Sequence, residues 1–485
     1  MPSIKKNFLY SSILTTANYL FPLLTYPYVS RVLGVTNIGI CNFVDSIIHY
    51  FILVSMMGIN IVGIREIAKS KNNQEQLNQT FSGLFWLNTI TTSIALVILV
   101  VVAVTVEQLR GHWQLMAIGA MKLVMNYMLI EWLYKGLEEF KYITIRTLAV
   151  KVMYVVAVFV FVRDSGDYPI YYLLSVLMIV LNAVINIVYS RYYVSLQIRG
   201  VNVSAFLKAF CILGVYQLLN SMYISLNVTY LGFVSGETEV GYYTTASKLY
   251  GILIALFTAF TGVMLPRMSS LLAEGKVEEF KSLLVKAYNI LFTFSIPLII
   301  FTVIYAPAII YIISGPGYEG AIMPMRIMMP LMLIIGYEQI IVVQTLMPLK
   351  KDKAILHNSI AGALTGLALN ILLVSALKSV GASLVWFCSE VVVLCCAQYY
   401  VSKYIQMSFP WKTLFHEMAI NFPLILMLVL AYLLVNNTWL SMSISAIVSI
   451  AYFVIYNLYI SHNREILSLV GASFVALKNK THING

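Results

Sequence analysis

Residues 81–106 read FSGLFWLNTITTSIALVILVVVAVTV and contain no Asp, Glu, Lys or Arg. An α-helix rises about 1.5 Å per residue, so roughly 20 consecutive apolar residues cross the hydrocarbon core of a bilayer. A buried helix of a soluble protein usually carries a much shorter apolar run. This stretch therefore predicts a transmembrane helix.

The same pattern recurs along the chain of 485 residues, which is 60% hydrophobic and only 11% charged. Soluble domains are about 25% charged, and no soluble core could bury so much apolar surface. The apolar runs are also longer than the roughly ten-residue alternating segments of a membrane β-barrel. We therefore predict an all-α integral membrane protein with about fourteen transmembrane helices. The predicted spans are residues 8–30, 38–64, 81–106, 112–134, 143–162, 169–190, 206–233, 241–265, 285–305, 321–346, 355–376, 380–402, 417–435 and 438–460.

The basic residues are distributed unevenly between these spans. With the N-terminus inside, 23 of the 31 Lys and Arg residues fall in inner segments, whereas the outer segments hold Arg31, Arg110, Arg163 and Lys378. This positive-inside bias predicts a multi-pass protein of the cytoplasmic (inner) membrane with both termini in the cytoplasm. Because the basic residues are dispersed, the net charge of +11 does not indicate a nucleic-acid partner.

The short connections between the spans leave no room for a soluble catalytic domain. The five cysteines include no CxxC pair, so they indicate neither a disulfide framework nor a metal site. A membrane polysaccharide polymerase is expected to carry a large outer loop, which this chain lacks. We therefore predict a transporter that is not an enzyme and that needs no cofactor or metal.

A weak internal repeat relates residues that lie 202 positions apart (236 − 34). The shift places Gly34 on Gly236, Gly39 on Gly241 and Arg65 on Arg267. It maps the first two predicted helices onto the seventh and eighth, and an even offset predicts parallel repeats about an axis along the membrane normal. The predicted parts are an N-terminal lobe at 1–200, a C-terminal lobe at 201–403, and helices 13 and 14 with a cytoplasmic tail at 404–485.

Several stretches resemble a known family. They read FPLLTYPYVSRVLGVTNIGICNF (21–43), GINIVGIREIAK (58–69), IEWLYKGLEEFKYITIRTLAVK (130–151), VGYYTTASKLYGI (240–252), VMLPRMS (263–269), GPGYEGAIMPMRIMMPL (315–331) and QTLMPLKKDK (344–353). Their order and spacing over most of the chain resemble the Wzx-type polysaccharide flippases. These form the oligosaccharide branch of the multidrug/oligosaccharidyl-lipid/polysaccharide exporter superfamily.

The resemblance implies two six-helix lobes around a central cavity, with two extra helices at the C-terminal end. It implies a substrate in which a polyprenyl diphosphate carries an oligosaccharide repeat unit. The protein would move this lipid to the outer leaflet for O-antigen, capsule or exopolysaccharide assembly. Membrane lipid and the polysaccharide polymerase machinery are the implied partners. A drug or cation antiporter and a peptidoglycan-precursor flippase of the same superfamily remain alternatives.

Ionisable residues inside transmembrane spans are costly and are candidates for function. The cations Arg31, Lys122, Lys248 and Arg326 are the predicted contacts of a diphosphate, although snorkelling or an ion pair would also explain them.

Glu131 and Lys151 are predicted to pair near the inner ends of the fourth and fifth spans, as a gate or as a structural ion pair. Asp45, Glu338 and Glu390 could bind a proton or sodium counter-ion, or they could be neutralised by protonation or by the lysines.

Overall fold

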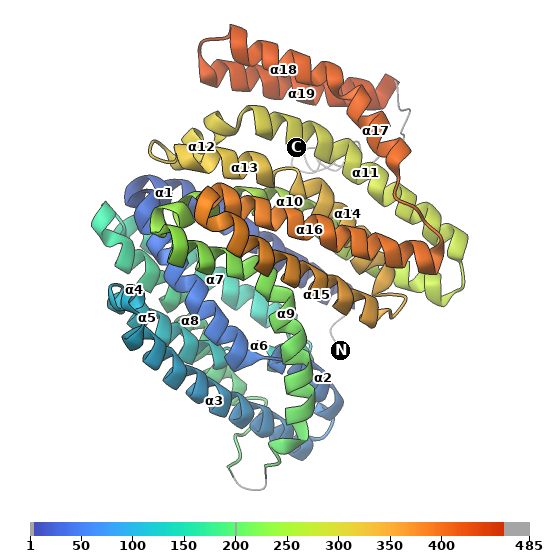
Figure 1. The fold of residues 1–485 in the computed structure, drawn as a ribbon. Coiled ribbons are helices and arrows are strands. Elements are labelled where there is room, and N and C mark those ends of the chain that lie inside the picture. The colour runs from blue at the N-terminus through green and yellow to red at the C-terminus, as the bar shows by residue number, and fades with distance from the viewer. Residues whose placement is uncertain (1–3, 199–200, 460–485) are drawn as a thin grey trace, which may run out of the picture. The chain divides into compact units, whose positions relative to one another are not determined.

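The computed structural model of the protein describes residues 4–198 and 201–459 (Figure 1). Within these residues every regular element is helical and none is a strand. The α-helices are α1 (Ile4–Met56), α2 (Ile59–Ser70), α3 (Gln74–Thr105), α4 (Glu107–Arg110), α5 (Trp113–Tyr127), α6 (Glu131–Gly136), α7 (Phe140–Phe161), α8 (Tyr168–Ser190), α9 (Ser204–Ser235), α10 (Glu237–Ala273), α11 (Val277–Ile304), α12 (Ala306–Ser314), α13 (Ile322–Met328), α14 (Leu331–Ile341), α15 (Asp352–Leu369), α16 (Ser375–Ile405), α17 (Trp411–Ile420), α18 (Phe422–Leu434) and α19 (Thr438–Tyr459). The prediction of an all-α membrane protein is confirmed.

The described residues contain ten helices that are long and apolar enough to cross a membrane. Two of them, at Ile13–Ser70 and Asp352–Ile405, are 58 and 54 residues long. Each is more than twice the roughly 20 residues that one crossing needs. Two shorter apolar stretches, Ser204–Val215 and Leu226–Ser235, lie within α9. The number of fourteen spans stays a prediction.

In each of the two longest apolar segments, one residue with positive φ interrupts a long helix. In α1 this residue is Gly34, with φ 76° and ψ 167°, and in α16 it is Lys378, with φ 52° and ψ −130°. Glycine adopts positive φ at little cost because it has no Cβ. Both breaks fall between predicted spans, at residues 31–37 and 377–379.

The repeated glycines give the clearest sign of a two-fold relation. Gly236, which lies between α9 and α10, has φ 86° and ψ 173°, close to the values of Gly34. A Cβ at Gly39 would collide with the carbonyl oxygen of Glu237, and one at Gly241 would collide with that of Val35. Both glycine pairs are 202 positions apart, as is the pair Val35 and Glu237. Such reciprocal contacts are what a two-fold axis between the repeats requires.

Close contacts divide the chain into two compact units. Unit 1 comprises Met1–Phe260, Ile310–Met328 and Asp352–Ala397, and unit 2 comprises Thr261–Ile309, Met329–Lys351 and Gln398–Gly485. Several helices, among them α10 and α16, run from one unit into the other. The division into lobes at 1–200, 201–403 and 404–485 stays a prediction.

Each unit has its own core. In unit 1, α6 packs on α2 because Gly63 lets the ring of Trp132 lie against the backbone, and Trp132 is fully buried. In unit 2, α11 packs on α14, and α18 and α19 form an antiparallel hairpin that also contacts α11 (Figure 1). The large buried side chains Phe292 and Tyr337 fill the contact between α11 and α14.

Candidate functional site

Lys248 of α10 is the centre of a polar cluster inside unit 1. Its Nζ donates a hydrogen bond to Oδ1 of Asn42 at 3.3 Å and lies 4.6 Å from the ring centroid of Tyr26. Both partners belong to α1 and neither carries a charge. Among the described residues no carboxylate lies within 4 Å of Lys248. The face of an aromatic ring attracts a cation without neutralising it.

Neighbouring hydrogen bonds hold these partners in place. The Nδ2 of Asn42 donates to the carbonyl oxygen of Ile38 at 2.7 Å and to Oγ1 of Thr244 at 3.2 Å. Because both amide protons are used, Oδ1 is left to accept from the lysine. The hydroxyl groups of Tyr26 and Thr245 share a hydrogen bond of 2.6 Å, which fixes the tyrosine ring. Asn42 and Thr244 are again 202 positions apart, so the repeat axis passes beside this cluster.

A second cation, Lys122 of α5, has a different environment. Its Nζ lies 2.5 Å from Oδ1 of Asp45 on α1, and the hydroxyl of Tyr172 on α8 donates to the same oxygen at 3.1 Å. The side chains of Lys122 and Asp45 are 17% and 40% exposed. The structure therefore pairs two residues that the sequence placed in separate roles, a diphosphate contact and an ion-coupling acid.

The two groups are adjacent on α1, because Asn42 and Asp45 are three residues apart and share one helix face. Together they hold two lysines and one carboxylate, which leaves one formal positive charge. That charge belongs to Lys248, since Asp45 neutralises Lys122. A cation held by neutral partners inside a membrane-spanning helix can stabilise an anion that enters its surroundings.

The predicted contact between Glu131 and Lys151 does not form. Glu131 instead accepts from Arg146 at 3.2 Å and pairs with Lys135 at 3.1 Å. Lys151 donates to Oδ1 of Asn18 and lies 5.7 Å from the ring centroid of Phe21. The sequence placed both residues at similar depth, but Arg146 is closer to Glu131, and Lys151 faces α1. A gating role for either residue stays a prediction.

Arg31 lies three residues before the break at Gly34 in α1, where it contacts the end of α12. Its guanidinium donates to the carbonyl oxygen of Ile312, and Gly315 leaves room for its aliphatic stem. The adjacent Ser30 donates to the carbonyl oxygen of Ile313 at 3.3 Å. Arg31 is exposed and does not contact Lys248 or Lys122. Its geometry favours anchoring of this part of α1 to α12, and its predicted role as a diphosphate contact stays a prediction.

The remaining predicted residues are Arg326, Glu338 and Glu390. Arg326 is on α13 of unit 1, and Glu338 is on α14 of unit 2. Glu390 is buried in α16, and its Oε1 accepts from the indole nitrogen of Trp386 at 2.9 Å. Their assigned functions, diphosphate contact for Arg326 and ion coupling for the two acids, stay predictions.

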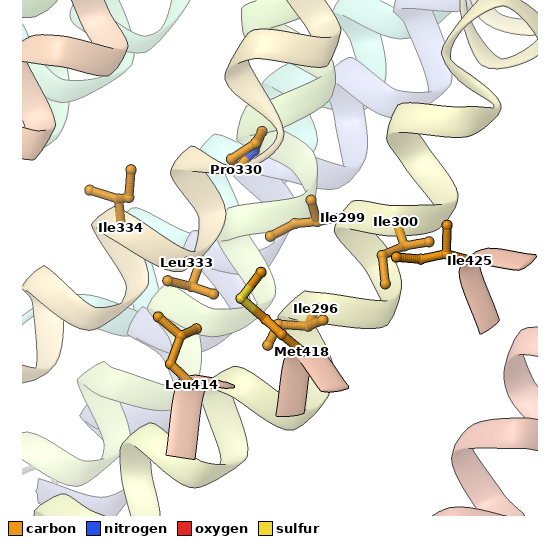
Figure 2. A pocket seen from close by; sticks show the side chains of 9 residues that line it. All are labelled: Ile296, Ile299, Ile300, Pro330, Leu333, Ile334, Leu414, Met418 and Ile425. Atoms are coloured by element: carbon orange, nitrogen blue, oxygen red, sulfur yellow. The ribbon is translucent and has the colours of Figure 1, made fainter. Parts of the chain in front are cut away.

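Unit 2 contains an apolar groove of about 350 Å³ (Figure 2). All nine residues that line it are apolar: Ile296, Ile299 and Ile300 of α11, Pro330, Leu333 and Ile334 at α14, and Leu414, Met418 and Ile425 of α17 and α18. Its side chains point toward one another from these three segments, as Figure 2 shows.

Glu417, next to Met418 in the chain, is a buried acid that the sequence analysis missed because it begins the thirteenth predicted span.

Comparison with known proteins now decides the family. The family model described as "Polysaccharide biosynthesis protein" matches residues 4–272, which is more than half of the chain. This chain is a member of that family. A relative from Escherichia coli (strain K12) named "Putative O-antigen transporter" is 26% identical over 398 residues, which cover 81% of this chain and 95% of the relative. A relative of the same name from Shigella dysenteriae is 25% identical and covers 75% and 91%.

Solved structures of low sequence identity share the fold. The lipid II flippase MurJ in an inward closed conformation matches with a TM-score of 0.76 at 13% identity, covering 95% of this chain and 99% of that one. A multidrug resistance transporter of the MATE family, in an inward-facing conformation, matches with a TM-score of 0.65 at 14% identity, covering 80% and 96%. At these identities the likeness establishes a shared transporter fold.

The sequence analysis considered only ionisable residues as candidates, so it did not identify the neutral residues around Lys248 and Lys122. Tyr26, Asn42 and Tyr172 lie in predicted spans as ordinary polar residues. The shift of 202 positions aligns Asn42 with Thr244, and this pairing of two polar side chains is the signal that could have drawn attention to them.

Proposed function

We propose that this protein is a flippase that moves polyprenyl-diphosphate-linked oligosaccharide repeat units from the cytoplasmic to the outer leaflet of the cytoplasmic membrane. The observation that carries the proposal is Lys248, a cation with neutral partners on α10, within the predicted span 241–265 of a polysaccharide biosynthesis family member. The names of the two relatives support O-antigen repeat units as the cargo class. A peptidoglycan precursor is a weaker alternative, because it rests on a likeness of fold alone.

The chemistry of the cargo explains why a cation is needed. A diphosphate carries about two negative charges, and an isolated charge in hydrocarbon costs tens of kcal/mol by Born solvation. Lys248 offers a point charge whose neutral partners leave it available to phosphate oxygens. Lys122 would bind phosphate oxygens only after its ion pair with Asp45 had broken. Arg31 and Arg326 are the further cations assigned to the path of the head group.

The protein's place in the cell follows from the same proposal. The positive-inside bias supports the cytoplasmic membrane, with both termini in the cytoplasm. The cargo crosses without any bond being made or broken, so the protein acts as a transporter and not as an enzyme. A polysaccharide polymerase on the outer side would consume the delivered repeat units.

Reconstitution tests this function directly. Purified protein in liposomes should move a fluorescent polyprenyl diphosphate oligosaccharide to the leaflet where a membrane-impermeant quencher reaches it. A monophosphate analogue should move more slowly, because it has fewer charges for the cation to bind. Equal rates with and without protein would overturn the proposal, and equal rates for both lipids would overturn the role of the diphosphate.

The membrane potential supplies a driving force for this cargo. The cytoplasm is electrically negative, so outward movement of one negative charge across 100 mV releases about 2.3 kcal/mol. Two charges release roughly 4–5 kcal/mol per 100 mV, enough to bias the distribution more than a thousandfold. A potassium–valinomycin potential should therefore accelerate flipping in oriented liposomes. A rate that ignores the potential and follows a proton or sodium gradient would instead favour coupling through Asp45, Glu338 or Glu390.

A further inference from the structure

Glu417 is a buried carboxyl group that the transport of an anion does not explain. It lies on α17 in unit 2, and its residue is 7% exposed. The hydroxyl of Thr293 on α11 donates to Oε1 at 3.0 Å. Oε2 is buried and has no hydrogen-bond partner among the described residues. Within the same residues, no Lys, Arg or His nitrogen lies within 4 Å of this carboxyl group.

The groups that face Glu417 are neutral or weakly titratable. On α17 the residue that precedes Glu417 is His416, which is exposed. From α19, Tyr456 is buried nearby and Tyr452 donates to the carbonyl oxygen of Ile420. From α11 the polar contact is Thr293, and the nearest charged residue along that helix is Lys286, about two turns away. α18, which forms the hairpin with α19, contains no charged residue, because its sequence is FPLILMLVLAYLL.

An ionised carboxylate in such surroundings would lose its hydration without gaining a cation. The penalty for an unpaired buried charge is large, and a buried acid normally escapes it by taking up a proton. A metal cation is a poorer solution, because hard cations need about six oxygen ligands and only the oxygens of Glu417 and Thr293 meet here. The geometry therefore favours a proton as the ligand.

We propose that Glu417 is a proton-binding site of this transporter. A proton from water forms an O–H bond at Oε2 and leaves the group neutral, and its return to water restores the carboxylate. Loss of the proton would leave a buried carboxylate with neither hydration nor a cation, so it would destabilise the packing of α17 on α11 beside the apolar groove, even though Thr293 of α11 could still donate to Oε1. The site thus makes the packing of the C-terminal helices sensitive to pH. Its effect on flux rests on the proposed flippase function, but proton binding itself does not.

Carbodiimide labelling tests proton binding without any transport assay. Dicyclohexylcarbodiimide reacts with protonated carboxyl groups in apolar surroundings. In the full-length protein in liposomes, mass spectrometry should find the adduct on Glu417 at low pH and find less of it as the pH rises. Exposed Glu278, whose side chain is 89% exposed, is the control that should stay unlabelled. Absence of an adduct on Glu417 at every pH would overturn the proposal.

The pH profile of flipping tests the role of the proton in transport. We expect Glu417→Gln to flatten the profile to less than about twofold between pH 5.5 and 8, because the amide mimics the protonated acid. Glu278→Gln is the matched control and should keep the wild-type profile. A wild-type profile in Glu417→Gln would overturn the role.

If Glu417→Gln does not insert into the membrane, Glu417→Asp replaces it. Aspartate keeps the proton but shortens the reach to Thr293, so its profile should shift along the pH axis without flattening. An unshifted profile would count against the proposal. If the wild-type protein moves no lipid diphosphate at all, the flippase function fails, and the labelling result alone decides whether Glu417 binds a proton.

Discussion

Lys122 and Lys248 both lie in predicted spans, at 112–134 and 241–265, and both contact α1, yet their environments differ in one respect. Lys122 meets the carboxylate of Asp45 at 2.5 Å, whereas Lys248 meets the amide of Asn42 at 3.3 Å and the ring of Tyr26. The contacts on α1 are only three residues apart. Depth in the membrane is therefore a poor guide to role, and the partner decides whether a cation is available to an anionic cargo.

The contrast has a simple electrostatic basis. A lysine paired with a carboxylate has its charge neutralised at short range, so an incoming phosphate must first displace the acid. A lysine that rests on an amide oxygen and an aromatic face has no carboxylate that an incoming phosphate must displace. From this comparison we propose that Lys248 contacts the cargo and that Lys122 has a structural role. Three sets of variants test this proposal, and a fourth tests the predicted contact between Glu131 and Lys151.

Removing the charge of Lys248 should have the largest effect. We expect Lys248→Met to slow flipping by about 10–100-fold, because a charge-assisted hydrogen bond contributes about 1.5–3 kcal/mol. Lys248→Arg should retain more activity than Lys248→Met, since it keeps the charge. Rates of fluorescent lipid diphosphate flipping in liposomes measure both, with Lys281→Met on the exposed part of α11 as the control. Normal flipping by Lys248→Met at wild-type abundance would refute the assignment.

Giving Lys248 a carboxylate partner, as Lys122 has in Asp45, should also slow flipping. In Asn42→Asp the new carboxylate would face the ammonium group, and we expect flipping to slow by about tenfold, the cost of roughly 1.4 kcal/mol needed to displace it. Asn42→Ser is the matched control, because it removes the amide without adding charge. If both variants flip lipid at the same rate, neutrality of the partner does not matter.

Breaking the pair of Lys122 and Asp45 should affect stability more than flipping. We expect Asp45→Asn or Lys122→Met alone to cost about 1 kcal/mol of the free energy of unfolding in detergent, a value reduced by the 40% exposure of Asp45. The double variant should recover part of this loss, because no unpaired charge remains. Additive losses in the double variant would show that the pair contributes nothing as a pair.

The smallest effect concerns Glu131 and Lys151, which do not touch. Their alanine variants should be additive within about 0.5 kcal/mol in a double-mutant cycle of stability. The same cycle for Glu131 and Arg146, which do form an ion pair, should show a larger coupling energy. A coupling between Glu131 and Lys151 as strong as that with Arg146 would restore the predicted contact between them.

The sequence succeeded where the property is local to one segment. Residues 81–106 are uncharged, and they form most of α3. Three of the predicted connections, at residues 31–37, 234–240 and 377–379, contain the positive-φ residues Gly34, Gly236 and Lys378, and glycine adopts such a backbone at little cost. The predicted contact between Glu131 and Lys151 was wrong because the sequence indicates the depth of each residue in its helix, but neither the rotation of the helix nor its neighbours.

The length and composition of its apolar segments by themselves determined that this chain is an all-helical membrane protein, because backbone groups in hydrocarbon must bond within their own helix. The 202-residue repeat likewise pointed to the glycines that meet in the fold. Only the tertiary structure decided which charge meets which partner: Lys122 and Asp45 are 77 residues apart, Lys248 and Asn42 are 206, and Glu417 and Thr293 are 124. Contacts over such separations depend on how whole helices pack and rotate, and no local pattern of residues encodes that.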